Sequence, residues 1–310
     1  MTTASAKPPS RVKQVQRWSA LAVAIVVGAF IVPVPALASS SRATGPYYYL
    51  SLGDSLAEGW QPAPADATLH GYSDRVVTDL ASQIPLTLVN YGCGGATTSS
   101  ALYNNGCSTG GEANDGTYYP TTTMVGAAVA FAQAHPGQVM LITISLGAND
   151  YGGCMADASP TNCVAALLGL IKTNLSTIAS DLRSAVGPSV PIIGITDITN
   201  DIQHYLTGKA GRTSAKEWLN EFKTVIVPSL QKAYAPSKVT LVNILSDVGS
   251  FIPWTKEVKY PPYGKIPLAV ARTCELTYEC STANADQHPD SAGYTLMAKE
   301  ISAAYVQLSK

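Results

Sequence analysis

Residues 47–59 read YYYLSLGDSLAEG, an apolar run that ends in Gly53-Asp54-Ser55. A short apolar run bounded by turn residues predicts a buried β-strand. Ser55 would then lie at the carboxyl end of the strand and near the first turn of a helix, where backbone N–H groups and the helix dipole favour a developing anion. Gly53 is predicted to let the chain turn sharply. The residues Gly-Asp-Ser are also common in ordinary turns, so evidence that Ser55 is a nucleophile has to come from the rest of the chain.

Four more apolar runs predict strands, at residues 87–91, 139–146, 191–196 and 239–244. Such near-continuous apolar strands are typical of a parallel sheet that is covered on both faces. Helical apolar stripes lie within 125–132, 164–182, 218–225 and 294–308, and the third is expected to end at Pro228. The alternation predicts an α/β fold, a three-layer α/β/α sandwich with a five-stranded, mainly parallel sheet. Functional side chains are expected in the loops at the carboxyl ends of the strands.

The composition narrows the classes of function. Of the 310 residues, 46% are apolar and 13% are charged, with 20 basic and 21 acidic side chains and a formal net charge of −1. A nucleic-acid-binding domain needs a basic patch to engage phosphates, so we expect no nucleic-acid partner. Disordered chains combine low hydrophobicity with high net charge, and this chain has neither.

The first 38 residues predict a secretory signal peptide. They contain four cations and no acid, then an apolar run, then Ala36-Leu37-Ala38. This order predicts Sec-type export with cleavage after Ala38. The alternative is an uncleaved anchor, which the shortness of the apolar run and the two prolines that end it disfavour. We therefore expect a secreted, extracellular mature domain at residues 39–310, with no stable membrane anchor.

A serine nucleophile needs a general base, and His288 is the best placed of the four histidines. It lies just before the C-terminal apolar stripe, between Asp286 and Pro289, and Asp290 is the expected N-cap of the helix that follows. Asp286 is close enough in sequence to orient the imidazole. The other three histidines lie in polar or Pro/Ala-rich stretches or at a helix end, and we expect them to be structural or solvated: His70, His135 and His204.

Two turns supply candidate donors for the oxyanion of an acyl-transfer reaction. The segment Gly147-Ala148-Asn149-Asp150 follows the strongest strand and offers the Asn149 side-chain amide. The segment 90–97, Asn-Tyr-Gly-Cys-Gly-Gly-Ala-Thr, follows the second strand, and its glycines can present a backbone N–H without obstruction. Each is an ordinary Gly/Asn turn when taken alone.

A competing serine stands in Gly106-Cys107-Ser108-Thr109-Gly110, which matches the G-x-S-x-G pattern. That motif needs a strand before it and a helix after it, and neither flank fits. Ser229-Leu230-Gln231-Lys232 matches S-x-x-K, but no K-T-G accompanies it. We interpret both as chance matches.

The four segments around Ser55, Gly95, Asn149 and His288 together resemble the four blocks of the SGNH (GDSL) hydrolase family. They occur in the family's order and each follows the expected element, so the resemblance covers essentially the whole mature chain. It is nearest to the secreted bacterial branch with three disulfides. The resemblance implies a flavodoxin-like strand order of 2-1-3-4-5. It also implies that Ser55 is the nucleophile, that His288 is the base, and that the oxyanion hole consists of the Ser55 N–H, the Gly95 N–H and the Asn149 side chain.

One position departs from the family's pattern. The usual last block places an acid three residues before the histidine, where this chain has Ala285, whereas Asp286 lies two residues before His288. The acid of the triad is therefore either the Asp286 carboxylate or a backbone carbonyl in its place. We favour the carboxylate, because it would also stabilise the imidazolium that forms during catalysis.

The six cysteines fit an oxidising compartment, and their pairing is open from the residues alone. The resemblance supports pairing of neighbours, because each resulting loop lies beside one of the four blocks: Cys93–Cys107, Cys154–Cys163 and Cys274–Cys280. The spacing lacks C-x-x-C and H-E-x-x-H motifs, so no metal and no other cofactor are expected.

We expect a secreted serine ester hydrolase, an esterase or lipase, that acts as a monomer on a small-molecule, lipid or glycan ester. A carbohydrate O-deacetylase that acts on plant or cell-wall polymers is one alternative. An inactive SGNH fold that serves as a binding module is another, and the complete set of four block residues argues against it. Four aromatic side chains are candidates to line an acyl or glycan groove, with cap packing or scattered surface positions as the alternative: Trp60, Tyr118, Tyr119 and Trp254.

Overall fold

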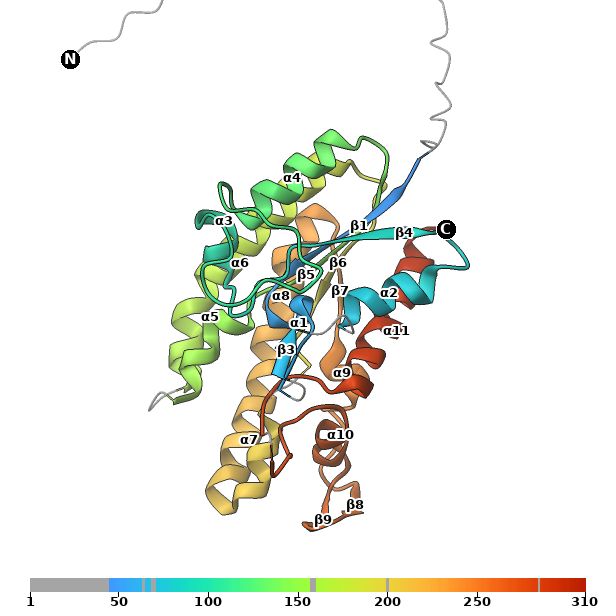
Figure 1. The fold of residues 1–310 in the computed structure, drawn as a ribbon. Helices are drawn as coiled ribbons and strands as arrows, with labels where there is room; N and C mark the ends of the chain where they lie inside the picture. Colours follow the sequence, from blue (N-terminus) through green and yellow to red (C-terminus); the bar gives the residue numbers. More distant parts are fainter. Residues whose placement is uncertain (1–44, 63–64, 68–70, 157–159, 199–200, 284) are drawn as a thin grey trace, which may run out of the picture. The chain divides into compact units, whose positions relative to one another are not determined.

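The five predicted strands form one sheet in the computed structural model of the protein, which describes residues 45–62, 65–67, 71–156, 160–198, 201–283 and 285–310. They are β1 (Tyr47–Gly53), β4 (Leu86–Asn90), β5 (Val139–Ser145), β6 (Ile192–Ile195) and β7 (Thr240–Val242). Their order is β4-β1-β5-β6-β7 and every neighbouring pair is parallel (Figure 1). Counted along the chain this is the order 2-1-3-4-5, so the predicted fold class is confirmed. The predicted signal peptide, residues 1–38, lies outside the described residues.

Helices cover both faces of this sheet. One face carries α4 (Met124–Ala134), α6 (Pro160–Val186) and α8 (Val227–Tyr234), and the other carries α2 (Tyr72–Leu80) and α11 (Ser291–Leu308) (Figure 1). The strands contribute alternate side chains to the two apolar cores. In β1, Leu50 and Leu52 belong to the first core, whereas Tyr49 belongs to the second.

The predicted stripe at 164–182 is the buried side of α6. Five of its side chains, spaced three to four residues apart or seven apart, are at most 1% exposed: Val164, Ile171, Leu175, Ile178 and Leu182. Full burial of such a side chain contributes about 1.5–3 kcal/mol each, so this face fixes the helix on the sheet. Among the described residues, the segment Thr161–Val186 is long and apolar enough to cross a membrane by length and composition.

The third predicted helix does not end at Pro228, so that expectation was wrong. The helix α7 (Lys209–Glu221) continues through a π-helical turn, Phe222–Ile226, directly into α8. Pro228 lies in the first turn of α8. A proline is tolerated there because its missing N–H falls where the π-helical turn has already changed the hydrogen-bond register.

Shorter elements complete the fold. They connect the strands at the carboxyl edge of the sheet or extend the chain beyond it: α1 (Ser55–Glu58), β2 (Trp60–Pro62), β3 (Ala65–Ala67), α3 (Thr98–Tyr103), α5 (Ala148–Gly152), α9 (Ile244–Val248), β8 (Glu257–Tyr260), β9 (Gly264–Pro267) and α10 (Leu268–Leu276). Turns of 3-10 helix cover Gly153–Ala156, Ile202–Thr207 and Ala235–Ser237. The helices α1, α3 and α5 begin directly after β1, β4 and β5 or a few residues later, which brings the three sequence blocks together.

The structure contains the three disulfides that the family resemblance implies, and no described cysteine is free. Cys93–Cys107 ties the loop after β4 to the segment that follows α3, Cys154–Cys163 connects the 3-10 turn after α5 to α6, and Cys274–Cys280 closes a loop at the end of α10. All three lie in the connections at the carboxyl edge of the sheet, where they restrict the loops that carry polar side chains.

Candidate active site

Ser55 is the first residue of α1, immediately after β1. Asp54 is the N-cap of this one-turn helix, and its buried carboxyl group accepts a hydrogen bond of 3.0 Å from the Leu56 N–H. Gly53 pairs with Ser145 of β5. A Cβ at Gly53 would lie 2.1 Å from the Ser145 Oγ, so glycine is required here for the close approach of two strands rather than only for a turn.

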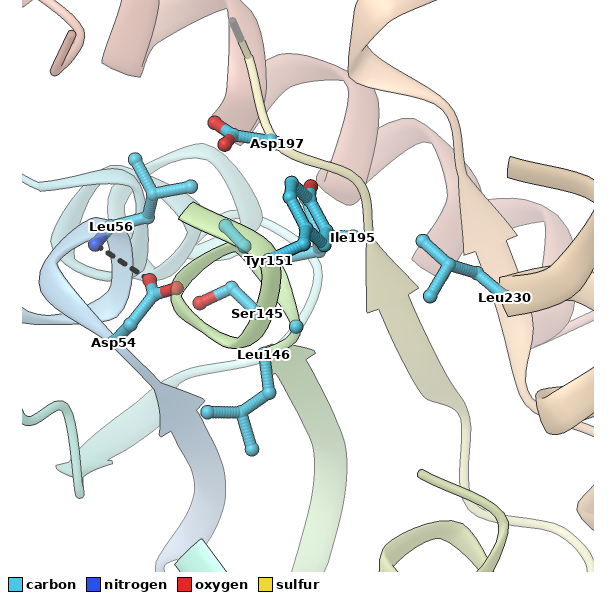
Figure 2. A pocket seen from close by; sticks show the side chains of 10 residues that line it. Asp54, Leu56, Ser145, Leu146, Tyr151, Ile195, Asp197 and Leu230 are labelled. Atoms are coloured by element: carbon cyan, nitrogen blue, oxygen red, sulfur yellow. Dashed lines mark hydrogen bonds between the residues drawn. The ribbon is translucent and has the colours of Figure 1, made fainter. Parts of the chain in front are cut away.

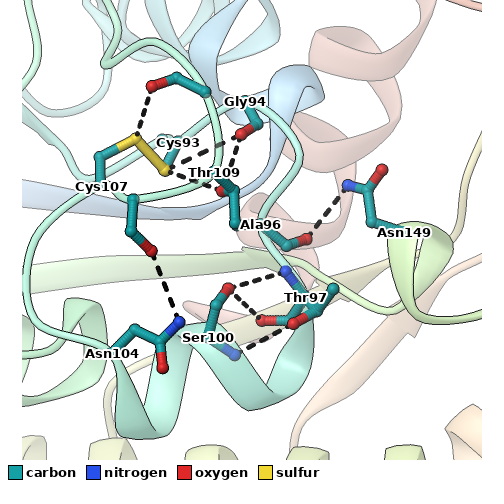
Figure 3. The surroundings of a disulfide bond; sticks show 12 residues. Cys93, Gly94, Ala96, Thr97, Ser100, Asn104, Cys107, Thr109 and Asn149 are labelled. Atoms are coloured by element: carbon teal, nitrogen blue, oxygen red, sulfur yellow. Dashed lines mark hydrogen bonds between the residues drawn. A yellow bond between two sulfur atoms is a disulfide. The ribbon is translucent and has the colours of Figure 1, made fainter.

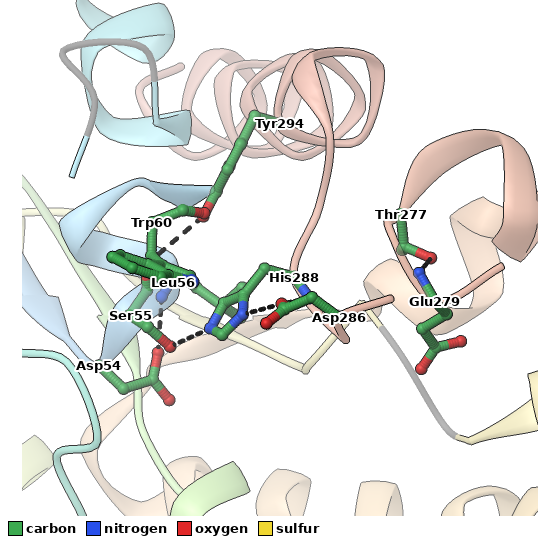
Figure 4. A network of polar contacts seen from close by, with 9 residues as sticks. All are labelled: Asp54, Ser55, Leu56, Trp60, Thr277, Glu279, Asp286, His288 and Tyr294. Atoms are coloured by element: carbon green, nitrogen blue, oxygen red, sulfur yellow. Dashed lines mark hydrogen bonds and ion pairs between the residues drawn. The ribbon is translucent and has the colours of Figure 1, made fainter. Parts of the chain in front are cut away.

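His288 connects Ser55 to Asp286 (Figure 4). Its Nε2 lies 2.6 Å from the Ser55 Oγ, and its Nδ1 contacts the Asp286 Oδ1. The same carboxyl oxygen accepts a hydrogen bond of 2.8 Å from the backbone N–H of His288. Of the two orienting groups left open by the sequence, the structure thus places the Asp286 carboxylate against the imidazole. Asp286 is one residue nearer to the histidine than the acid of the usual block. Its carboxylate still reaches Nδ1, because it folds back over the backbone of His288.

The Asp286 carboxyl group is held in its charged form. Burial by itself would raise its pKa, but the side-chain and backbone hydrogen bonds from His288, together with the charge of the imidazole, bring the pKa below its usual value. An ionised carboxylate on Nδ1 fixes the tautomer that leaves Nε2 free to accept a proton from Ser55.

The loop that carries His288 is pinned on both sides. Asp290 caps α11 as predicted, accepting a hydrogen bond of 2.9 Å from the Gly293 N–H. On the other side, the Tyr278 N–H donates to the His288 carbonyl at 3.0 Å, and the Asp286 N–H donates to the Tyr278 carbonyl at 3.2 Å. Tyr278 lies within the loop closed by Cys274–Cys280, so that disulfide holds the backbone against which the imidazole is positioned.

The three predicted oxyanion donors come from three different loops. In the described part of the chain, the backbone N–H groups of Ser55 and Gly95 donate to no other residue. Gly95 has a φ of +73°, a backbone conformation that favours glycine. The Asn149 Nδ2 donates to the Ala96 carbonyl at 3.1 Å (Figure 3). The same nitrogen lies 3.4 Å from the Asp54 Oδ2. The second distance exceeds that of a normal hydrogen bond, so a substrate oxyanion can replace Asp54 as the acceptor.

Two side chains that the sequence did not single out hold these loops together. The Asn90 Nδ2 donates to the Ala57 carbonyl at 2.9 Å, and the Asn90 Oδ1 accepts from the Gly92 N–H at 2.9 Å, which ties α1 to the glycine loop. The Asp150 carboxylate accepts from the N–H and the hydroxyl of Thr98 at 2.8 and 2.5 Å. Both belong to quoted blocks, yet only the fold shows which partners they have.

Ser55, Asn149 and His288 line one pocket, together with Asp54 and Asp197. A neighbouring pocket, shown in Figure 2, shares Asp54 and Asp197 and extends toward Tyr151. Burial raises the pKa of Asp54 to about 8, and the negative charges of Asp197 and Asp150 act in the same direction against the Leu56 N–H. The Asp54 carboxyl group therefore carries little negative charge at neutral pH, which suits a site that has to stabilise an oxyanion.

The four aromatic side chains that were candidates to line a groove lie in different surroundings. The Trp60 ring lies 6.2 Å from the His288 ring in an edge-to-face arrangement, beside the catalytic candidates. Tyr118 is 72% exposed, whereas Tyr119 is buried in the apolar core and packs on Tyr91. Trp254 packs on Tyr205 in a separate apolar cluster. Tyr119 is thus a packing residue, and of the four candidates Trp60 is the one whose ring packs on His288.

The alternative candidates lie elsewhere. Ser108 is exposed in a loop next to the disulfide-bonded Cys107, with neither strand nor helix beside it. His135 ends α4 as predicted, with its Nδ1 2.9 Å from the Phe131 carbonyl, and His204 lies in a 3-10 turn. His70 lies outside the described residues. Among the described residues, no group of three or more His, Cys, Asp or Glu side chains is arranged to hold a metal ion.

Glu279 is a buried acid that lowers the stability of the folded protein, and the sequence did not single it out. Both carboxyl oxygens of Glu279 are buried and have no hydrogen-bond partner in the described structure (Figure 4). Burial raises its pKa well above the usual value, and Asp201, Asp197 and Asp286 add to the rise. Folding therefore requires this carboxyl group to take up a proton or to bury a charge.

We expect Glu279→Gln to stabilise the protein at pH 7.5 and not at pH 4.5. An acid with a raised pKa in the folded state loses stability as the pH rises above its unfolded-state pKa of about 4.3. Because glutamine carries no titrating proton, the variant should gain about 1–3 kcal/mol in free energy of unfolding at the higher pH. Urea unfolding at both pH values measures this, with the exposed Glu275→Gln as the matched control. Equal gains at the two pH values would contradict the assignment.

The fold and the Ser55–His288–Asp286 contacts place the chain among α/β proteins with a serine–histidine–carboxylate arrangement. The model of the GDSL-like lipase/acylhydrolase family matches residues 51–296, and the chain belongs to this family. The confirmed family is therefore the one indicated by the four sequence blocks.

Three solved structures that are similar to this chain are each matched over nearly the whole of their own length. The extracellular lipase of Streptomyces rimosus is 13% identical, with a TM-score of 0.51, over 83% of this chain and 99% of that one. The phospholipase A1 of Streptomyces albidoflavus is 15% identical, with a TM-score of 0.49, over 84% and 99%. A carbohydrate acetylesterase family member of Sinorhizobium meliloti is 12% identical, with a TM-score of 0.46, over 85% and 99%. No curated protein sequence matches this chain.

Proposed function

We propose that this protein is a serine ester hydrolase in which Ser55 forms an acyl-enzyme and His288 is the general base. The observation that carries the proposal is the continuous contact from the Asp286 carboxylate through the imidazole to the Ser55 Oγ, 2.6 Å from Nε2. This geometry meets the requirement that a nucleophile lie within hydrogen-bond reach of a base that is itself oriented by a third group.

The reaction follows from these positions. The Ser55 Oγ attacks the ester carbonyl carbon while its proton passes to Nε2 of His288, and the carbonyl electrons move onto the oxygen. The N–H groups of Ser55 and Gly95 and the Asn149 amide stabilise that oxyanion. Collapse breaks the bond to the alcohol, which leaves with the proton from His288. Water then attacks the acyl carbon as it gives a proton to His288. Collapse of this second intermediate breaks the bond to the Ser55 Oγ, which takes the proton back from His288 as the acid is released.

Two measurements test this function. Purified protein should hydrolyse p-nitrophenyl esters, and a fluorophosphonate probe should label Ser55, as located by peptide mass spectrometry. Absence of both hydrolysis and labelling would support the inactive binding module instead. Comparing p-nitrophenyl esters of increasing acyl length with acetylated xylan separates an esterase or lipase from a carbohydrate O-deacetylase, since the latter should release acetate from the polymer and reject long acyl chains.

We expect Asn149→Ala to lower kcat by about 10²–10³ with a smaller change in KM, because loss of one oxyanion donor acts mainly on the transition state. Steady-state kinetics on p-nitrophenyl acetate measures both constants. Asn104→Ala is the matched control, because Asn104 is an exposed residue at the end of α3. A kcat near that of the wild type would remove Asn149 from the oxyanion hole.

We also propose that the protein is exported and that residues 39–310 form the mature domain. The three disulfides support an oxidising compartment, where such bonds persist. N-terminal sequencing of the protein recovered from the culture medium tests the cleavage site, which we expect to leave Ser39 as the first residue. A first residue within the apolar run, or protein retained in the membrane fraction, would contradict this proposal.

A further inference from the structure

Glu58 is a buried acid beside the nucleophile that the mechanism above does not use. It lies three residues after Ser55 on the one-turn helix α1 and is 5% exposed. Among the described residues its carboxyl group forms no hydrogen bond and no ion pair, and its oxygens, unlike those of Glu279, keep some contact with solvent. An acid in a mostly buried position is partly desolvated, which costs stability, so the position of Glu58 calls for a physical reason.

The Glu58 carboxyl group fits between two glycines of the loops that follow β4 and α3. A Cβ at Gly94 would lie 2.5 Å from its Oε2, and a Cβ at Gly111 would lie 3.2 Å from its Oε1. The two glycines are joined by a hydrogen bond of 3.0 Å from the Gly94 N–H to the Gly111 carbonyl. The carboxyl group therefore packs directly on the backbone that leads into Gly95, the proposed oxyanion donor.

The backbones around the Glu58 carboxyl group are closely packed. A Cβ at Gly92 would lie 2.5 Å from the Glu58 backbone N, and a Cβ at Gly110 would lie 2.3 Å from the Gly94 carbonyl oxygen. Three segments thus meet by backbone-to-backbone packing: α1, the loop 92–95 and the segment 109–111. In so close a packing, removing a side chain from between the backbones lets them shift or leaves a void.

The shape of the Glu58 side chain matters here more than its charge. Burial raises its pKa to about 7, against the opposing effect of His288, so a large share of the carboxyl groups is uncharged near neutral pH. A negative charge beside the oxyanion loop would also oppose the charge that develops in the transition state. A glutamine of the same shape should therefore replace it, whereas a shorter acid should not.

We propose that Glu58 is a positioning residue, whose carboxyl group supports the Gly94–Gly95 backbone from the α1 side and so fixes the Gly95 N–H at the oxyanion. The inference rests on the proposed ester hydrolysis and adds to it the residue that holds one of the donors. Glu58 itself touches no reacting atom.

Three substitutions in the full chain separate shape from charge: Glu58→Gln keeps the shape, Glu58→Asp keeps the charge but shortens the reach, and Glu58→Ala removes both. We expect Glu58→Gln to keep kcat within about threefold, and the other two to lower kcat by about 10- to 100-fold with KM nearly unchanged, since a small misplacement of catalytic groups costs up to about 10² in rate. Glu112→Gln, a change of an acid in the adjoining segment, is the matched control.

Hydrogen–deuterium exchange of the peptide covering residues 91–97 gives a readout that does not depend on catalysis. Faster exchange in Glu58→Asp and Glu58→Ala, but not in Glu58→Gln, is the expected result, with far-UV circular dichroism unchanged in all three. Unchanged exchange in all variants would overturn the positioning role, whether or not the wild type hydrolyses an ester. Loss of kcat in Glu58→Gln with retention in Glu58→Asp would overturn it as well, in favour of a role for the charge.

Discussion

Replacing Ser55 by alanine is expected to abolish ester hydrolysis almost completely, with a loss of kcat on the order of 10⁶. Among the described residues, the hydroxyl group within hydrogen-bond distance of Nε2 of His288 is that of Ser55, whose Oγ lies 2.6 Å away. Without it no acyl-enzyme forms, and any residual rate comes from the oxyanion donors acting on water. Burst kinetics on a p-nitrophenyl ester and labelling by a fluorophosphonate probe should both disappear.

Ser108→Ala is the matched control for this experiment. Ser108 belongs to the G-x-S-x-G pattern of the sequence, yet it is exposed in an irregular loop. Its replacement should leave kcat and labelling as in the wild type. If Ser108→Ala lost activity and Ser55→Ala kept it, the nucleophile would have been assigned to the wrong motif.

Asp286→Asn is expected to lower kcat by about 10⁴, the second largest effect, while substrate binding changes little. An asparagine presents either an amide N–H or an uncharged oxygen to Nδ1, so it no longer fixes the tautomer or stabilises the imidazolium. The lowered pKa of Asp286 shows that its charged form is the one bound by His288. The pH–rate profile should change with it, since the base loses the negative charge beside it.

Asp290→Asn in the same loop controls for a disturbed backbone. Asparagine is as good an N-cap as aspartate, so α11 and the position of His288 should be preserved. Retained activity in Asp290→Asn with loss in Asp286→Asn would attribute the effect to the carboxylate. A loss of less than about tenfold in Asp286→Asn would instead favour orientation of His288 by a backbone carbonyl.

Much of the fold was predictable, because its signals are local. Five apolar runs gave five strands, with ends that differ by one or two residues, and the stripe at 164–182 gave the buried side of α6. The predicted helix end at Pro228 was wrong. A proline ends a helix where its missing N–H would have formed a hydrogen bond, and the π-helical turn before α8 removes the need for that bond. The sequence carried no signal for that turn.

The chain by itself determined which residues can do the chemistry. The serine after β1 and the histidine before α11 are placed by short motifs and by strand ends, and parallel strands bring their carboxyl ends to one edge. The cysteine pairs were implied by the family resemblance and are present in the structure. Only the tertiary structure decided that the Asp286 carboxylate, rather than a carbonyl, meets Nδ1. It alone placed Glu58 against Gly94 and Gly111 and left the buried Glu279 carboxyl group without a hydrogen-bond partner among the described residues. The physical reason is that the burial and the partner of an acid are set by segments distant in the chain, whereas a turn or an apolar run is set by adjacent residues.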